Sequence, residues 1–345
     1  MFLPVDAPAP SIRNAGSQIA DSDWKVLSRY WYPVALSGEI GERPCKARLL
    51  DVDLALFRSG DQLVAVLDRC PHRWVRLSAG KVCNGNLVCA FHGLAFDRSG
   101  QCVDVPALGR AARLPAHYRV RTFRTGVRYG MVWVCLDETS SEVLPTYGAL
   151  EGYHDSALGF APVCQWPMSA ARQIENFVDI AHLPFVHATT LGGDPLARQL
   201  PPRIEQEPDA VVFRTKYVET VGFPAPTEFE FTYRVHLPFS IDFRTQAEGG
   251  LGFRSMNIAS PTSAHTCRVF QLMIRGAPGE VFEAAGELPM GGGDGPGVIN
   301  QQDIDMLKEL TIPDLPLNEK LEIHLPVDNV SMAYRKRLRE MGLGS

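Results

Sequence analysis

The sequence lacks three features that would place it in common functional classes. No apolar run approaches the roughly 20 residues that a membrane helix needs; a typical one, Met131–Leu136, is far too short. Basic residues are not in excess, since 34 Lys and Arg face 39 Asp and Glu for a net charge of −5. Residues 1–16 hold no apolar segment of the kind found in signal peptides. These absences argue against a membrane partner, a nucleic-acid partner and export.

We therefore expect a cytoplasmic protein whose thiols stay reduced. Eight cysteines in such a chain indicate metal binding before disulfides. The length of 345 residues favours two domains, and 45% apolar residues suffice for packed cores.

The order of hydrophobic patterns predicts an α+β protein. Residues 20–33 suggest a short helix, and residues 41–140 a small antiparallel β domain with turns at Ser59-Gly60-Asp61 and Asn84-Gly85. Helical periodicity follows at 168–187. Alternating segments then predict one broad antiparallel sheet; they span residues 211–218, 229–237, 240–245, 253–258 and 266–274.

Further helices are expected at about 300–310 and 329–341. A Gly-rich stretch at 283–298 suggests either a linker or a lid. The basic run Arg335-Lys336-Arg337 with Arg339 is interpreted as a solvated helix face, and a docking patch for an acidic partner is the alternative.

Two cysteines and two histidines in the β domain form the first constellation. Cys70-Pro71-His72 is followed by Cys89-Ala90-Phe91-His92, so each of two loops supplies one thiol and one imidazole. Two Cys and two His suit tetrahedral zinc, but zinc fingers usually present a Cys pair and then a His pair. The interleaved order favours a Rieske [2Fe–2S] cluster, in which one iron takes both thiolates and the other both imidazoles.

A carboxylate and two histidines around a proline form the second constellation. Asp179 and His182 are three residues apart, as on one helix face, whereas His182 and His187 would diverge on an ideal helix. Pro184 removes a backbone donor, so we expect the helix to kink or end there and His187 to swing towards His182.

Two imidazoles and one carboxylate on one face form the triad of oxygen-activating Fe(II) sites. Asp179 is one candidate for the carboxylate. The others are Asp303 and Asp305 of a distant predicted helix. Two buried structural histidines are the alternative to a metal site.

Together the two constellations resemble the Rieske non-haem iron oxygenases over nearly the whole chain. Cys70-x-His72, followed by Arg73, and Cys89-x₂-His92 in Phe91-His92-Gly93 match that family's cluster ligands. Asn176-x₂-Asp179-x₂-His182-x₄-His187 matches its iron motif, in which both histidines bind iron. Leu94 and Trp74 depart from the usual residues without removing a ligand.

The last third of the chain is similar to the oxygenases built of one subunit type, such as the phthalate, vanillate and dicamba enzymes and the methylxanthine N-demethylases. The resemblance implies that Asp303 is the third iron ligand, with Asp305 in reserve. It also implies that Asp179 is a bridging acid, which connects the iron to the cluster of a neighbouring subunit in a homotrimer. Asn176 of the same motif is the other candidate catalytic residue.

Three segments are implied by the same resemblance. Residues 1–40 would form an N-terminal helical segment packed on the catalytic domain, and residues 41–141 a β domain holding the cluster. Residues 142–345 would form the catalytic domain, in which a curved antiparallel sheet grips a long helix.

The implied activity is hydroxylation, or O- or N-demethylation, of an aromatic or heterocyclic small molecule with O₂. Electrons would come from NAD(P)H through a separate reductase or ferredoxin. An electron carrier whose second domain only binds a ligand is the alternative. Apolar candidates for the pocket lining are Phe185, Ile241, Phe243, Phe253 and Met256.

Overall fold

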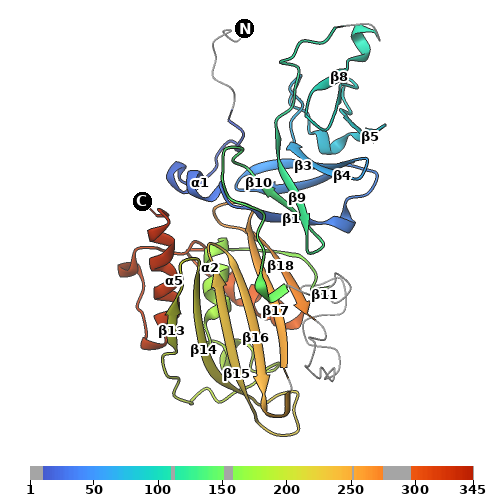
Figure 1. Cartoon of the computed structure of the whole chain (residues 1–345). Helices are drawn as coiled ribbons and strands as arrows, with labels where there is room; N and C mark the ends of the chain where they lie inside the picture. The colour runs from blue at the N-terminus through green and yellow to red at the C-terminus, as the bar shows by residue number, and fades with distance from the viewer. Residues whose placement is uncertain (1–10, 110–112, 151–157, 251, 275–296, 345) are drawn as a thin grey trace. The chain divides into compact units, whose positions relative to one another are not determined.

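A computed structural model describes residues 11–109, 113–150, 158–250, 252–274 and 297–344 (Figure 1). The chain divides into two compact units. The first comprises Met1–Ile19 and Ser28–Glu142, and the second Ala20–Leu27 and Val143–Ser345. Most of the Gly-rich stretch at 283–298 lies outside the described residues. Within them, no helix is long and apolar enough to cross a membrane.

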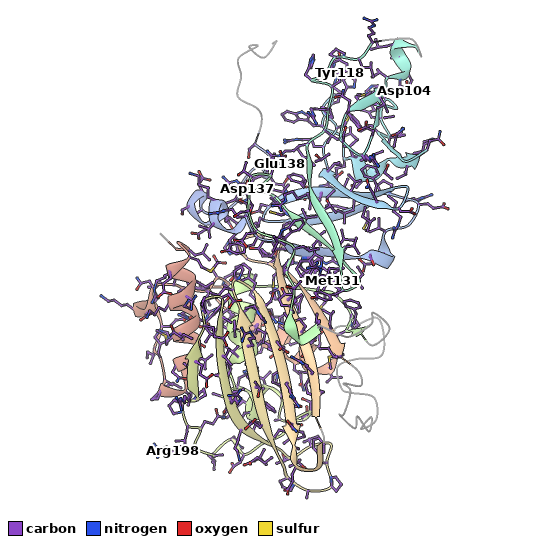
Figure 2. All side chains as sticks on the ribbon, in the orientation of Figure 1. Asp104, Tyr118, Met131, Asp137, Glu138 and Arg198 are labelled. Atoms are coloured by element: carbon purple, nitrogen blue, oxygen red, sulfur yellow. The ribbon has the colours of Figure 1, made fainter. Side chains whose placement is uncertain are left out.

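The first unit is built of two antiparallel sheets. The larger has the order β1-β10-β9-β4-β3-β2 and the smaller the order β5-β6-β7-β8. The large sheet contains β1 Tyr32–Leu36, β2 Cys45–Leu49, β3 Val52–Ser59, β4 Gln62–Leu67, β9 Thr122–Arg128 and β10 Met131–Cys135. The small sheet contains β5 Lys81–Cys83, β6 Asn86–Val88, β7 Ala95–Phe96 and β8 Cys102–Asp104. Met131, where β10 begins (Figure 2), is completely buried, as are the other residues of that strand.

Both predicted turns of this unit are confirmed. Asn84 and Gly85 adopt positive φ angles of 49° and 74° between the paired residues Cys83 and Asn86, as a tight two-residue hairpin loop requires. Gly60, with a φ of 61°, turns the chain between the paired residues Ser59 of β3 and Gln62 of β4. Asn84-Gly85 therefore specifies the β5–β6 hairpin of the small sheet through its local backbone preference.

The expectation of a helix through residue 33 was wrong, and the N-terminal segment is divided. Helix α1 spans only Asp21–Leu27, and β1 follows it at Tyr32–Leu36. Pro33 disfavours helical geometry at Tyr32, and β1 pairs with β10 around a bulge at Pro33. Residues from Ser28 onward thus belong to the first unit through backbone pairing, unlike the expected segment 1–40.

The second unit contains one eight-stranded antiparallel sheet, which confirms the predicted broad sheet and the α+β class. Its order is β11-β18-β17-β16-β15-β14-β13, and β12 also pairs with β18. The strands are β11 Leu158–Phe160, β12 Cys164–Trp166, β13 Arg203–Gln206, β14 Ala210–Glu219, β15 Thr227–His236, β16 Ser240–Ala247, β17 Gly252–Pro261 and β18 Cys267–Ile274. The long strands match the five predicted segments, and β15 alternates along its length, whereas most of β17 and β18 is buried on both faces.

One face of this sheet packs against helix α2, Ala170–Val178. The Phe177 ring lies edge-on to Phe243 at 5.7 Å, and Asn257 of β17 donates a hydrogen bond to Gln173 at 3.2 Å. Ser169 caps the helix by accepting from the Arg172 N–H. The sheet thereby fixes the helix that leads into the histidine segment.

The break in the predicted helix 168–187 is confirmed, but its position was wrong. The helix ends at Val178, and a second short helix, α3, spans Leu183–Val186. The Asp179 carboxylate accepts the Ala181 N–H at 2.8 Å, a local bond that competes with helix continuation. Pro184 instead lies in the first turn of α3, where proline needs no donor. Asp179 and His182 therefore do not share a helix.

Two further helices of the second unit follow the sheet in the chain. Helix α4 spans Val298–Leu307 and carries Asp303, and helix α5 spans Asn329–Glu340 beside β14 (Figure 1). Both confirm the predicted C-terminal helices within a few residues.

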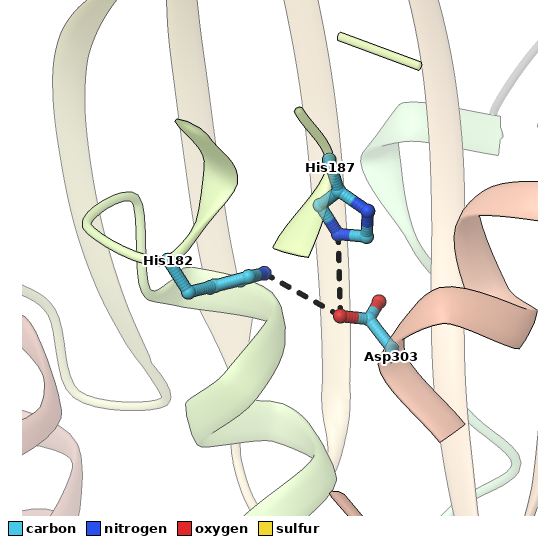
Figure 3. A group of neighbouring side chains, drawn as sticks. All are labelled: His182, His187 and Asp303. Atoms are coloured by element: carbon cyan, nitrogen blue, oxygen red, sulfur yellow. Dashed lines mark ion pairs between the residues drawn. The ribbon is translucent and has the colours of Figure 1, made fainter. Parts of the chain in front are cut away.

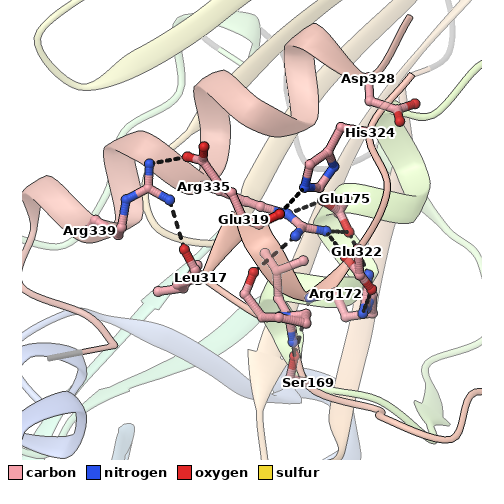
Figure 4. Close-up of polar contacts among 12 residues, drawn as sticks. Ser169, Arg172, Glu175, Leu317, Glu319, Glu322, His324, Asp328, Arg335 and Arg339 are labelled. Atoms are coloured by element: carbon pink, nitrogen blue, oxygen red, sulfur yellow. Dashed lines mark hydrogen bonds and ion pairs between the residues drawn. The ribbon is translucent and has the colours of Figure 1, made fainter. Parts of the chain in front are cut away.

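The basic run of α5 does not form one solvated face (Figure 4). Arg335 is 2% exposed, and its guanidinium donates through two nitrogens to Glu175 of α2, at 2.7 and 2.9 Å. Glu322 accepts from Arg335 and from Arg172, and Arg172 also donates to Glu175. Two arginines and two glutamates thus alternate in a network that links α5 to α2. Of the run, Lys336 keeps a largely exposed side chain.

Removing Arg335 should destabilise the second unit. Arg335→Met leaves the buried Glu175 with Arg172 alone, and breaking a buried ion pair costs about 3–5 kcal/mol. Denaturant unfolding should show a loss of this size, whereas Lys336→Met should change the free energy of unfolding by less than about 0.5 kcal/mol. Equal effects of the two variants would contradict a stabilising role for the network.

Candidate metal centres

The first centre is formed by two loops of the first unit that share one backbone geometry. In one, Cys70 N–H donates to the Val75 carbonyl and Trp74 N–H to the Cys70 carbonyl, both at 2.8 Å. In the other, Cys89 N–H donates to Leu94 and Gly93 N–H to Cys89, at 2.9 and 3.1 Å. Each loop therefore presents its Cys and its His from the same kind of turn.

The matched geometry explains the positive φ angle of the unusual Trp74. Gly93 has a φ of 73°, and Trp74, at the equivalent place in the other loop, has a φ of 60°. Such positive values cost a non-glycine residue of order 1 kcal/mol or more. The tryptophan is over half exposed and lies under the Arg69 guanidinium, 5.2 Å from its ring centroid. Trp74 thus departs from the family pattern but leaves the backbone conformation of the loop unchanged.

The four side chains of these loops separate by burial. Cys70 and Cys89 are each 2% exposed, whereas His72 and His92 are exposed with ring centroids 4.7 Å apart. Burial raises the pKa of the Cys70 thiol to about 11, and the neighbouring Cys89 adds to this. Two adjacent buried thiols become thiolates only when a metal compensates their charge. Buried sulfur and exposed imidazole fit a cluster with one iron on each side.

The second centre brings together His182, His187 and Asp303 (Figure 3). The histidines stand at the two ends of α3, and Asp303 comes from α4. Asp303 Oδ1 lies 3.4 Å from His182 Nε2 and 3.2 Å from His187 Nε2. One ligand atom from each residue lies within 4.8 Å of the others. Donors bound at about 2.0–2.2 Å to one ion lie at comparable separations.

Electrostatics indicates that this group is completed by a cation. Asp303 and His187 are buried, and Asp303 Oδ1 makes no well-aligned hydrogen bond. Burial would raise the pKa of Asp303, but the two imidazoles hold it below its usual value. Burial would also lower the pKa of His182, but the carboxylates of Asp179 and Asp303 raise it to about 9. A buried site that favours a positive charge, with two imidazoles and a carboxylate facing one another, fits a divalent metal in place of the proton.

The geometry distinguishes the three candidate carboxylates. Asp303 faces both imidazoles, whereas Asp305 points away and pairs with Lys308 at 2.9 Å with its side chain half exposed. Asp179 lies on the other side of His182, with Oδ2 3.5 Å from Nδ1, and the Asn176 carbonyl accepts the Asp179 N–H. The structure thus brings Asp303 to the histidine pair and leaves Asp179 beside it.

Sequence reasoning missed Gln302, which precedes Asp303. Its side-chain oxygen lies 2.9 Å from His187 Nδ1. The sequence offered one signal for Gln302, its position next to the candidate ligand Asp303, because a single glutamine does not form a recognisable motif.

The expected pocket lining is partly wrong. Phe185 is 66% exposed, and Met256 lies on the opposite face of the sheet from Phe243, since Ser255 is the partner of Phe243. Phe243 and Phe253 do share the α2-facing side and contact each other edge-on at 5.4 Å. Strand register decides which face of the sheet a side chain occupies, because a shift of one residue moves it to the opposite face.

Family models match both units of the chain. A Rieske [2Fe–2S] domain matches residues 30–124, and the vanillate O-demethylase oxygenase C-terminal domain matches residues 166–343. These matches cover both candidate centres.

Individual relatives extend the likeness over nearly the whole chain. Methylxanthine N1-demethylase NdmA of Pseudomonas putida is 28% identical over 334 residues, 94% of this chain and 91% of the relative. The dicamba O-demethylase oxygenase component of Stenotrophomonas maltophilia is 35% identical over 49% of this chain and 50% of its own length. The solved structure of NdmA of Pseudomonas putida CBB5 with caffeine has a TM-score of 0.74 at 26% identity, covering 93% of this chain and 92% of that one.

Asp303→Ala should remove the metal of the second centre and leave the first intact. Among the described residues, Asp303 is the carboxylate that faces both imidazoles, and its loss leaves two neutral donors, which hold Fe(II) poorly. Iron analysis should show about one iron fewer per chain with an unchanged visible spectrum. Asp305→Ala is the matched control and should keep its iron. Iron loss in Asp305→Ala but not in Asp303→Ala would refute this choice of carboxylate.

Proposed function

The chain belongs to the Rieske non-haem iron oxygenases with a vanillate O-demethylase-type C-terminal domain, and we propose that it hydroxylates or demethylates an aromatic or heterocyclic small molecule. Its relatives include N-demethylases, an O-demethylase and a 3-chlorobenzoate-3,4-dioxygenase. Demethylation is favoured because two relatives that match over 94% of this chain are methylxanthine demethylases. The enzyme would be the terminal oxygenase of a multicomponent system.

Seven residues would hold the two metal groups. Cys70 and Cys89 would bind one iron of the cluster, and His72 and His92 the other. His182, His187 and Asp303 would hold the mononuclear Fe(II). The convergence of these last three side chains, from α3 and α4, is the single observation that carries the proposal. When bound, such an iron supplies open positions for O₂, and the cluster supplies electrons.

The surrounding residues would position the ligands and the substrate. Asp179 faces the free nitrogen of His182 and would orient that ring. Phe177 of helix α2, with Phe243 and Phe253 of the sheet, offers edge and face contacts to a flat ring. These groups favour a planar aromatic or heterocyclic substrate over an aliphatic one.

The electrons would come from a separate protein. Every strand pair in the described part of the chain is antiparallel, so it contains no parallel sheet of the kind that binds dinucleotides. We therefore propose an NAD(P)H-dependent reductase, with or without a ferredoxin, as the partner. A homotrimer, in which Asp179 connects the iron to the cluster of a neighbouring copy, is the proposed assembly.

Turnover with a surrogate reductase tests this function. N-methylated heterocycles and methoxylated benzoates would be screened by O₂ uptake, product mass and formaldehyde release. A hydroxylated methyl group on nitrogen or oxygen collapses to formaldehyde, so one formaldehyde should appear per demethylated product. A pure electron carrier would hold two irons per chain instead of three and would release no formaldehyde.

Asp179→Asn should fold and keep both metal groups but transfer electrons poorly. The amide has nearly the same shape as the carboxylate and lacks its charge-assisted hydrogen bonds. In a single turnover with substrate and O₂, reoxidation of the reduced cluster should slow by about 10–100-fold. Asp305→Asn, on the exposed side of α4, is the control. Reoxidation of Asp179→Asn at the wild-type rate with full product would exclude the connecting role.

A further inference from the structure

We propose that Gln302 is a positioning residue that fixes the ring and the tautomer of His187 for metal binding. The inference rests on the proposed role of His187 as an iron ligand and names the residue that makes the role possible. A neutral imidazole binds a metal through the nitrogen that carries no hydrogen. His187 must therefore carry its hydrogen on Nδ1, because Nε2 faces Asp303.

The contacts of Gln302 suit this requirement. Its Oε1 lies 2.9 Å from His187 Nδ1 and accepts from the Thr190 hydroxyl at 2.9 Å. Its Nε2 donates to the Thr189 hydroxyl at 3.0 Å. All three polar contacts come from the segment that follows α3, so the side chain connects α4 to that segment.

Only one orientation of the Gln302 amide is compatible with a metal on Nε2. If the amide were reversed, its NH₂ group would face Nδ1, and Nδ1 would have to be the acceptor. The hydrogen of neutral His187 would then sit on Nε2, pointing at Asp303 and at the metal position. The threonine hydroxyls can donate or accept and so tolerate both orientations. The contact with His187 is the one that selects the useful orientation.

The backbone of His187 is held independently of this contact. Its carbonyl accepts the N–H groups of Thr190, Leu191 and Gly192 at 2.9–3.0 Å, and its N–H donates to Leu183 at 2.9 Å. Loss of the Gln302 side chain should thus leave the loop in place and free only the ring. This separates a positioning effect from a folding effect.

The two proposed histidine ligands have partners of different charge. His182 faces the Asp179 carboxylate across 3.5 Å, whereas His187 faces a neutral amide. Gln302 directly precedes Asp303 on α4. The same helical turn therefore supplies an anionic ligand to the metal, from Asp303, and a neutral acceptor to Nδ1 of His187, from Gln302. A carboxylate at position 302 would still accept from Nδ1–H, so Gln302→Glu should preserve the tautomer.

The test compares Gln302→Leu with Gln302→Glu in the cluster-containing protein. Mononuclear iron is removed with a chelator, and Fe(II) is titrated back anaerobically against a competing chelator. Gln302→Leu should bind Fe(II) about 10–100-fold more weakly, as for other residues that orient metal ligands. Gln302→Glu should bind within about threefold of wild type or more tightly. Gln301→Leu, which alters the exposed neighbour that contacts Asp305, should bind like wild type.

The remaining outcomes decide against the inference. Wild-type affinity in Gln302→Leu would overturn it. So would weakened binding in both Gln302→Leu and Gln302→Glu together with a lowered unfolding temperature, since that pattern indicates packing. The variant His187→Ala distinguishes failure of the proposed ligand role of His187 from failure of the positioning role of Gln302. If it keeps iron, the ligand assignment fails; if it loses iron while Gln302→Leu does not, only the positioning role fails.

Discussion

The second unit depends on one buried carboxylate placed between two imidazoles. Asp303 is 7% exposed and lies 3.2–3.4 Å from the Nε2 atoms of His182 and His187. Burying an anion without a partner is costly, so the group is stable only if cations or a metal surround it. The eight-stranded sheet, helix α2 and the short helix α3 place the histidines, and α4 supplies the acid. The Arg172–Glu175–Arg335–Glu322 network links α2 to α5 and so helps to fix the helix that leads into the histidine segment.

The first unit also buries groups that a metal would stabilise, here the thiols of Cys70 and Cys89 instead of a carboxylate. Two loops of equal backbone geometry place sulfur inside and imidazole outside. The shared turn geometry explains the positive φ of Trp74, which occupies the position of Gly93 in the other loop. A cluster bound there would have its thiolates in the interior and its histidines at the surface, where an electron partner can approach them.

Local signals in the sequence predicted much of this structure. Alternating segments predicted the long strands, Asn84-Gly85 predicted a hairpin, and the spacing of Cys and His indicated both candidate centres. Where several residues far apart decide the outcome, the sequence was insufficient. Pro184 lies within the first turn of α3 because Asp179 ends the preceding helix, and Arg335 is buried because Glu175 and Glu322 meet it. Gln302 has a role only through its distance to His187, which no spacing reveals.

The most direct test of the account is anomalous diffraction at the iron edge from crystals of the iron-loaded protein. The account predicts one isolated iron bound by His182, His187 and Asp303, and a separate two-iron group at Cys70, Cys89, His72 and His92. It also predicts the Gln302 oxygen within hydrogen-bond distance of His187 Nδ1. An isolated iron bound by Asp179 or Asp305 in place of Asp303, or no iron between the two histidines, would contradict it.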